Sequence, residues 1–246
     1  MKISLVSLVI TAGTLAWPVL GVAQVPFFGA QKTNFYEQKA NDKVPTKAYS
    51  HSLDAFVTVD KSRDAKKFTL SAVKTVILKR SGKNFGESIF FKTLTDLNKE
   101  FPVGDAYTFT VVGGSLNGQF GALPIEADAF PQVPYLLGAE LTELQNLSAD
   151  STVTLNIGYG DAGATSTAVT FAIFDTTGQI YVLNGSAGTT SFVIPSSEIS
   201  QLATGVKYTG QLTNFNTSEV TSTGSFTTAA NSDGWCSSTN FTIEVQ

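Results

Sequence analysis

The sequence predicts an all-β protein with two β-sandwich units that follow a cleaved signal peptide. First, apolar and polar residues alternate with a period of two over several short runs, as in strands with one buried face. Second, the chain is rich in Thr, Ser, Val and Phe, and its hydrophobic fraction of 42% is sufficient for packed cores. Third, a Gly-x-x-Tyr unit occurs twice, each time ahead of threonine-rich alternation.

The first 23 residues have the composition of a signal peptide. Lys2 precedes the apolar run ISLVSLVITAGTLAWPVL, and Gly21 and Ala23 are the small side chains that signal peptidase requires. We expect cleavage after Ala23, because the strictly apolar core is shorter than the ~20 residues of a membrane-spanning helix and Pro18 lies near its end. The mature chain is therefore expected to be secreted, periplasmic or at the cell surface, without a stable membrane span.

Charged residues are distributed unevenly along the mature chain. Between Gln24 and Gly113 lie 14 of the 16 Lys and Arg but only 9 of the 20 Asp and Glu, which gives this half a net charge of +5. Beyond Gly113, one Lys and 11 acidic residues give −10. The asymmetry supports a boundary between two units and predicts self-association through the opposite charges of the two halves. The alternative is that the halves merely have different solvated surfaces.

The front half divides into an extended arm at 24–50 and a basic β unit at 51–113. In the arm, the polar stretch YEQKANDKVPTK has no sustained period. In the β unit, the alternating runs DAFVTVD and KFTLSA flank the polar turn KSRDAKK, which predicts a hairpin. SIFFKTL and YTFTVV supply further strands.

A linker at 114–130, rich in Gly and Pro, leads to an acidic β-sandwich at 131–246. In AELTELQNL, leucines three residues apart predict a short helical cap over the end of the sandwich. STVTLNIGY then alternates clearly, and five later runs are expected to be strands at the spacing of a sandwich. These runs are TAVTFAIFD, GQIYVLNG, TSFVIP, KYTGQLTNF and NFTIEV.

The repeated unit has a defined layout. In the back half, Leu202 lies three residues before Gly205, and Tyr208 lies three residues after it. In the front half, Gly104 and Tyr107 repeat this spacing, and the apolar residues ahead of them are Leu97 and Phe101. The two copies are separated by about one sandwich domain of ~100 residues.

This layout resembles the tyrosine corner of fibronectin type III and immunoglobulin-like domains. The resemblance covers most of the back half and, in the front half, chiefly the corner. It implies that the glycine allows a tight turn, the leucine closes the core, and the tyrosine hydroxyl bonds to backbone a few residues upstream. The whole pattern is also similar to a group of exported bacterial proteins with a leader, a front β unit and this corner. Neither resemblance implies a catalytic residue.

Catalytic and zinc sites are not predicted. His51 has Asp54 three residues on, but the sequence lacks the Gly-x-Ser-x-Gly elbow that would supply an activated serine. One histidine and one cysteine fall short of the usual three or four zinc ligands. A hydrolase with an unrecognised site remains an alternative, and it would require a deep pocket that converges on His51.

Acidic residues offer two carboxylate pairs of the kind that glycosidases use and three candidate calcium ligands. Glu140 and Glu143 share a helical spacing, and Glu126 and Asp128 share a strand spacing, but both pairs fall in capping or linking segments. Hard oxygen ligands for calcium would come from three loop residues without the spacing of a known calcium loop. These residues are Asp161, Asp175 and Asp233. No metal or other cofactor is predicted.

Four aromatic residues are candidates for a ligand-facing platform, because exported β-sandwiches often present flat rings to sugars. They are Tyr135, Tyr159, Tyr181 and Trp235. The alternative is that the tyrosines end strands and Trp235 packs near Cys236. Cys236 has no partner for an intramolecular disulfide, and we expect it to be buried.

The sequence therefore predicts an exported, non-enzymatic adhesion, scaffold or surface-interaction protein. Its expected partner is a surface or extracellular protein or a polysaccharide, and nucleic acid is disfavoured because the basic half is only modestly basic. A carbohydrate-binding module is the main alternative.

Overall fold

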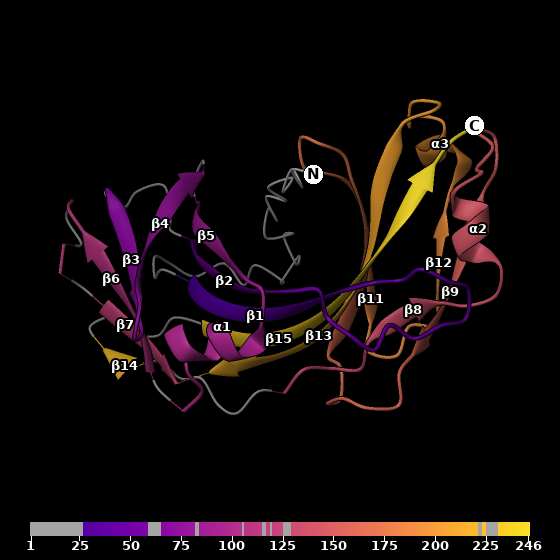
Figure 1. Cartoon of the computed structure of the whole chain (residues 1–246). Coiled ribbons are helices and arrows are strands. Elements are labelled where there is room, and N and C mark those ends of the chain that lie inside the picture. The colour runs from indigo at the N-terminus through magenta and orange to yellow at the C-terminus, as the bar shows by residue number, and fades with distance from the viewer. Residues whose placement is uncertain are drawn as a thin grey trace.

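The computed structural model describes residues 27–58, 65–81, 84–104, 106–114, 117–118, 120–124, 129–220, 223–224 and 231–246. The expected signal peptide and residues 125–128 of the expected linker lie outside these ranges. The described part is mostly strand and forms two units joined by long, twisted strands (Figure 1). The prediction of an all-β fold is confirmed.

The back unit is a sandwich of two sheets. Its strands within the described residues are β8 (Pro134–Leu136), β9 (Val153–Tyr159), β10 (Ala168–Phe174), β11 (Gln179–Ser186), β12 (Ser191–Ile194), β13 (Lys207–Val220) and β15 (Asn231–Glu244). The three-stranded sheet β12-β9-β8 packs against the four strands β11-β10-β13-β15. This is the strand arrangement of a fibronectin type III-like sandwich.

Alternation along β9 shows why these residues form a strand with one buried face. Val153, Leu155 and Ile157 point into the core, whereas Thr154 and Asn156 are exposed. Residues two apart share one face of a strand, so a single period-two run produces both a dry and a wet surface.

The front unit repeats the same arrangement. Its strands are β1 (Phe27–Glu37), β2 (Ser50–Thr58), β3 (Lys67–Ser71), β4 (Thr75–Ser81), β5 (Asn84–Phe91), β6 (Ala106–Val112) and β7 (Phe120–Pro124). The strand order is β1-β2-β5 followed by β4-β3-β6-β7, and the two groups are joined because β4 also pairs with β5. The front unit thus has a three-stranded group and a four-stranded group that enclose one core, as the two sheets of the back unit do. The predicted hairpin of β2 and β3 is wrong, because β2 pairs with β1 and β5, and β3 pairs with β4 and β6.

A long ribbon of the back unit inserts into the front unit. β13 and β15 each contain 14 residues, and their outer halves extend beyond the back sandwich. There, β15 pairs in parallel with β1, and β14 (Thr223–Gly224) pairs with β7. The ribbon therefore covers both edge strands of the front unit, and one continuous 12-stranded sheet runs through the molecule.

The front unit sends a segment back in exchange. Residues 38–49 follow β1 and cross over the back unit (Figure 1). Gln38 donates from Nε2 to the carbonyl of Leu136 (2.9 Å) and accepts at Oε1 from the Leu136 N–H (2.8 Å), so its amide acts like a strand partner of β8. Further along, Asp42 accepts from the Gly138 N–H. The segment expected as an extended arm thus contains a central strand and a connection between the units.

Within the described residues, three short helices close the ends of the sandwiches. They are α1 (Leu94–Glu100), α2 (Glu140–Leu144) and α3 (Ser196–Ile199). The expected helical cap is confirmed, because Leu141 and Leu144 of α2 are buried in the back core. In the described part of the chain, no helix has the length and apolar character needed to cross a membrane.

Each unit has its own hydrophobic core. The front core is dominated by phenylalanines, among them Phe28, Phe68 and Phe109. Trp235 of β15 also belongs to the front core, although it lies in the last strand of the chain. The expected boundaries at 113 and 131 remain a prediction; the sheet itself is continuous across the two units.

Candidate functional site

The back corner is formed by the end of α3 and the start of β13. The Tyr208 hydroxyl accepts a hydrogen bond from the Ala203 N–H at 2.9 Å. Gly205 has φ of +73°, which favours glycine, and its N–H donates to the carbonyl of Val245 near the C-terminus. Leu202 is buried in the back core. The corner thus ties three chain segments together.

The front corner lies between α1 and β6. The Tyr107 hydroxyl donates to the carbonyl of Pro102 at 3.1 Å, and the Tyr107 ring packs edge-on against Phe101. Gly104 has φ of +85°, and Leu97 is fully buried. The two tyrosines differ in polarity, because Tyr208 accepts from an N–H and Tyr107 donates to a carbonyl.

Two of the four candidate aromatics lie on the sheet β12-β9-β8. The Tyr135 ring lies over Gly158, where an added Cβ would come within 2.6 Å of a ring carbon. Tyr159 packs against the back core, and its hydroxyl donates to the carbonyl of Thr189 at 2.6 Å. Burial raises the pKa of Tyr159.

The other two aromatics lie elsewhere. Tyr181 is on β11 and packs against the edge of the back core. Trp235 is only 4% exposed and is part of the front core. The structure does not gather the four rings on one face, and the Trp235 ring is unavailable to a ligand.

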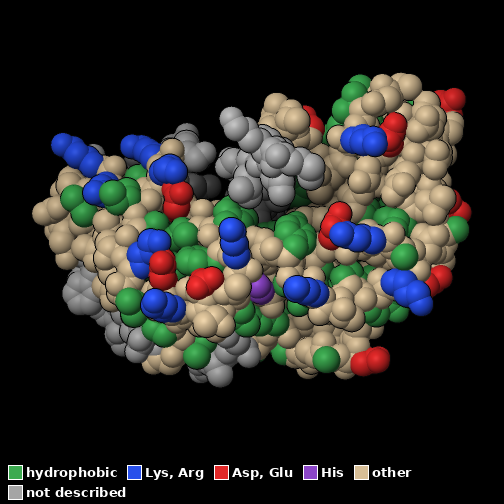
Figure 2. Space-filling view, viewed as in Figure 1, with side chains coloured by type: hydrophobic (Ala, Val, Ile, Leu, Met, Phe, Trp, Pro, Cys, Tyr) green, Lys and Arg blue, Asp and Glu red, His purple; other side chains and the backbone are tan. Residues whose placement is uncertain are grey.

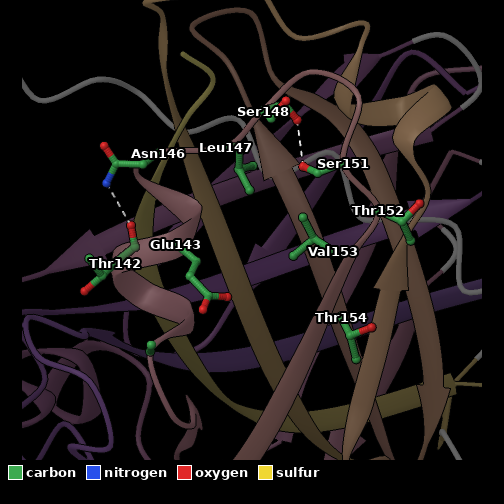
Figure 3. A pocket seen from close by; sticks show the side chains of 10 residues that line it. Thr142, Glu143, Asn146, Leu147, Ser148, Ser151, Thr152, Val153 and Thr154 are labelled. Atoms are coloured by element: carbon green, nitrogen blue, oxygen red, sulfur yellow. Dashed lines mark hydrogen bonds between the residues drawn. The ribbon is translucent and has the colours of Figure 1, made fainter.

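A groove between α2 and the start of β9 is the candidate binding site (Figure 3). Its volume is about 500 Å³, within the range of ~300–1,000 Å³ typical of small-molecule sites. Leu147 and Val153 lie between the helix and the strand, and polar groups surround them. The polar groups come from Thr142, Glu143, Asn146, Ser148, Ser151, Thr152 and Thr154. No sequence motif indicated this groove, because its residues are hydroxyls and amides in a short connection.

The floor of the groove is fixed by the end of the chain. The Leu147 N–H donates to the carbonyl of Glu244, and the Gln246 N–H donates to the carbonyl of Leu147. On the rim, Asn146 donates to the carbonyl of Thr142 and Ser151 donates to that of Ser148. The groove therefore presents preformed hydrogen-bonding groups rather than a mobile loop.

The carboxylate pair on α2 does not converge on the groove. Glu143 lines it, whereas buried Glu140 accepts hydrogen bonds from the backbone N–H and the side-chain amide of Asn156. Burial raises the pKa of Glu140, the bonds from Asn156 oppose this, and the charge of Glu143 adds to it. Glu140 thus holds α2 against β9. The second pair, Glu126 and Asp128, lies outside the described residues.

His51 has a structural contact with the neighbouring strand β1. Its Nδ1 lies 2.6 Å from Oδ1 of Asn34 on the neighbouring strand, and burial lowers the His51 pKa. Asp54 is three residues away in the same strand, so its side chain is on the opposite face.

Asp54 and Cys236 form a buried polar cluster with hydroxyl groups. Ser52 and Thr33 donate to Oδ2 of Asp54 at 2.7 and 3.3 Å. Burial raises the Asp54 pKa, opposed by hydrogen bonds from Ser88, Ser52 and Thr33. Cys236 is a free, buried cysteine, and burial together with the Asp54 charge raises its thiol pKa well above the ordinary value. The thiol is therefore protected from reaction.

The three candidate calcium ligands lie in three different segments, and only two of these segments are loops. Asp175 accepts at Oδ1 from the backbone and hydroxyl of Thr177 and from the Gly178 N–H, which lowers its pKa and closes the β10–β11 turn. Asp161 lies in the connection before β10, and Asp233 lies in β15. Within the described ranges, no group of three or more His, Cys, Asp and Glu could hold a metal ion.

Three side chains of β13 and β15 bind the segment 129–132 between the two units, and no sequence pattern predicts these contacts. Asn214 and Asn216 of β13 donate to the carbonyls of Gln132 and Ala129, both at 2.9 Å. Ser237 of β15 donates to the carbonyl of Pro131 at 2.7 Å. These three side chains clamp the chain segment that leads from the front unit into the back unit.

Comparison with known proteins adds little. No family model matches the sequence, and no curated protein matches it. Solved structures with some likeness include the fibronectin(III)-like modules of Clostridium thermocellum CbhA, with 10% identity over 87% of this chain and 90% of that one and a TM-score of 0.23. The chicken CNTN1 FN1–FN3 domains show 9% identity over 89% and 68%, with a TM-score of 0.21. Because these scores are low, the fibronectin type III-like assignment rests on the strand order and the corners.

Proposed function

We propose that the protein is an exported, non-enzymatic scaffold or surface-interaction protein whose two sandwich units act as one rigid body. The observation that carries the proposal is the exchange between the units. The ribbon of β13 and β15 completes the front unit, and residues 38–49 are bound to the back unit. Tandem domains usually move relative to each other unless their interface is large, and a shared sheet opposes such motion.

A rigid pair of units suits a protein that holds a partner at a fixed distance and orientation. Binding surfaces on a stiff scaffold lose less conformational entropy on association than surfaces on a flexible chain. The partner class remains a surface or extracellular protein or a polysaccharide.

Positive and negative charges are less separated in space than they are along the sequence. Lys39, Lys43 and Lys47 belong to the segment 38–49 that crosses the acidic back unit. Lys and Arg are accordingly spread over both units in Figure 2. Self-association driven by separate positive and negative halves is weakened by this mixing, since nearby opposite charges neutralise each other at a distance.

Carbohydrate binding is the second candidate, and the α2 groove favours it. Sugars present many hydroxyl groups, and the groove offers hydroxyl, amide and carboxylate partners above an apolar floor. This site differs from the expected aromatic platform, since none of the four aromatic residues lines the groove.

The test is a binding screen of the mature chain against polysaccharides and cell-envelope preparations at low and high salt. Asn146→Ala changes the groove, and Gln201→Ala, an exposed amide outside both the groove and β11, is the control. Binding to envelope material that both variants retain is expected for the scaffold. Saturable sugar binding that survives salt and is lost only in Asn146→Ala would favour the carbohydrate module. Binding to neither material, or release of sugar or peptide products, would overturn the scaffold proposal.

A further inference from the structure

We propose that β11 is a pairing edge through which two copies of this chain associate, strand to strand and antiparallel. β11 ends the 12-stranded sheet and pairs only with β10 among the described strands. An edge strand has unpaired backbone N–H and C=O groups along its free side, and these can bind another strand.

The usual protection of edge strands is missing along most of β11. Natural edges are guarded by Lys, Pro, inward-pointing charges or bulges. No charged residue occurs between Asp175 and Glu198, and Pro195 is the only proline in that interval. The pairing with β10 has one irregularity, between Ile173 and Phe174, near the start of β11. The rest of the strand keeps a regular register up to Ser186.

Both faces of this edge are apolar. Ile180 and Val182 point away from the core and are 45% and 37% exposed. Tyr181 and Leu183 alternate with them and are only partly buried against the back core. Four consecutive apolar residues at an edge would bury surface on both faces if another strand paired with them, which strengthens backbone pairing.

The strand is complementary to itself. An antiparallel pair centred on Tyr181 would place Ile180 opposite Val182 of the second copy on one face and the two Tyr181 rings together on the other. Such a contact uses the same patch on both molecules and closes as a two-fold dimer. An uncharged strand also meets no like charge directly across the ladder.

The surroundings predict how salt acts on this dimer. Glu198 lies close enough to Tyr181 for its charge to raise the Tyr181 pKa, after the larger effect of burial. Two-fold pairing at Tyr181 would bring two Glu198 carboxylates toward each other. Added salt screens this repulsion, so the β11 dimer should strengthen with salt, whereas association between oppositely charged halves should weaken.

Sedimentation of the mature chain over a range of concentrations, at low and high salt, tests the proposal. We expect a monomer–dimer equilibrium that shifts toward dimer with salt and is abolished in Val182→Lys. Val193→Lys is the matched control, because Val193 is 53% exposed on β12 of the other sheet. Unchanged thermal unfolding of both variants would show that the substitutions leave the fold intact.

Single cysteines introduced in turn from Ile180 to Leu183 map the register. Only a residue that lies opposite itself forms a disulfide readily, so Tyr181→Cys should cross-link strongly under mild oxidation and its neighbours weakly. The buried thiol of Cys236 should not interfere. A wild-type chain that stays monomeric at every concentration, or a dimer that survives Val182→Lys, would overturn the proposal.

Discussion

Each of the two corners depends on one tyrosine side chain. Whether the tyrosine hydroxyl accepts or donates its hydrogen bond predicts how much stability the hydroxyl contributes. Tyr208→Phe leaves the Ala203 N–H without its acceptor, whereas Tyr107→Phe removes one donor from the Pro102 carbonyl. An N–H has a single hydrogen to donate and loses its partner, whereas a carbonyl has two lone pairs and needs only one of them filled. We expect Tyr208→Phe to lower the free energy of unfolding by about 1–2 kcal/mol, and Tyr107→Phe by less. Urea unfolding of both variants measures the difference, and an equal or reversed order would contradict it.

Asp54 gives a pH-dependent prediction at the same scale. Burial raises its pKa in the folded state above the ordinary value of 3.8, so folding favours the protonated form. Its contribution to stability is present at low pH and is lost as pH rises through the folded-state pKa. Asp54→Asn keeps an oxygen acceptor for Ser52 and removes this loss.

The variant Asp54→Asn should therefore gain stability relative to the wild type as pH rises from about 3.5 toward neutrality. Urea unfolding across this range measures the gap. A gap that does not change with pH would show that the Asp54 carboxyl titrates alike in the folded and unfolded chain.

At the scale of elements, residues 38–49 depend on the amide of Gln38. Gln38→Glu has nearly the same shape and still accepts from the Leu136 N–H, but its ionised carboxylate cannot donate to the Leu136 carbonyl. We expect a loss of about 1–3 kcal/mol at neutral pH. The loss should shrink on acidification, because a protonated Glu can donate again.

Urea unfolding of Gln38→Glu at neutral and acidic pH provides the measurement. Gln145→Glu is the control, because the Gln145 side chain is exposed at the C-terminal end of α2. A loss in Gln38→Glu that stays constant with pH would contradict the role of the Gln38 donor.

The sequence predicts elements with a local pattern better than it predicts how the strands pair. The period-two run of β9 and the leucine spacing of α2 are local patterns, so both could be predicted. The polar stretch YEQKANDKVPTK predicts an extended arm, and the strand β1 ahead of it has no clear apolar alternation because it contains Lys32 and Asn34, which are buried. Lys32 is tolerated there because it donates to Asn98 of α1. Strand pairing across the whole chain depends on backbone groups, which every residue carries, and it leaves no local signal.

The same limit applies to the candidate site. The α2 groove is made of Thr, Ser and Asn in a short connection, and these residue types are common in ordinary turns. Trp235 was a reasonable ligand-facing candidate, since exposed tryptophans bind sugars, but its place in the front core follows from the ribbon. Only the pairing of β15 with β1 could have revealed it.

For the whole molecule, the exchange between the units predicts that they unfold together. Trp17 lies in the expected signal peptide, so Trp235 is the one tryptophan of the mature chain, and it reports on the front core although it belongs to a strand of the back unit. Leu212→Ala removes a fully buried side chain from the back core, which should cost about 2–5 kcal/mol. If the ribbon joins the units, this change lowers the denaturant midpoint seen by Trp235 fluorescence as much as the midpoint seen by far-ultraviolet circular dichroism.

Phe68→Ala in the front core is the reciprocal variant, and it should also shift both signals together. Separate transitions, with Trp235 unaffected by Leu212→Ala, would mean that the units fold independently, and the rigid scaffold would lose its physical basis.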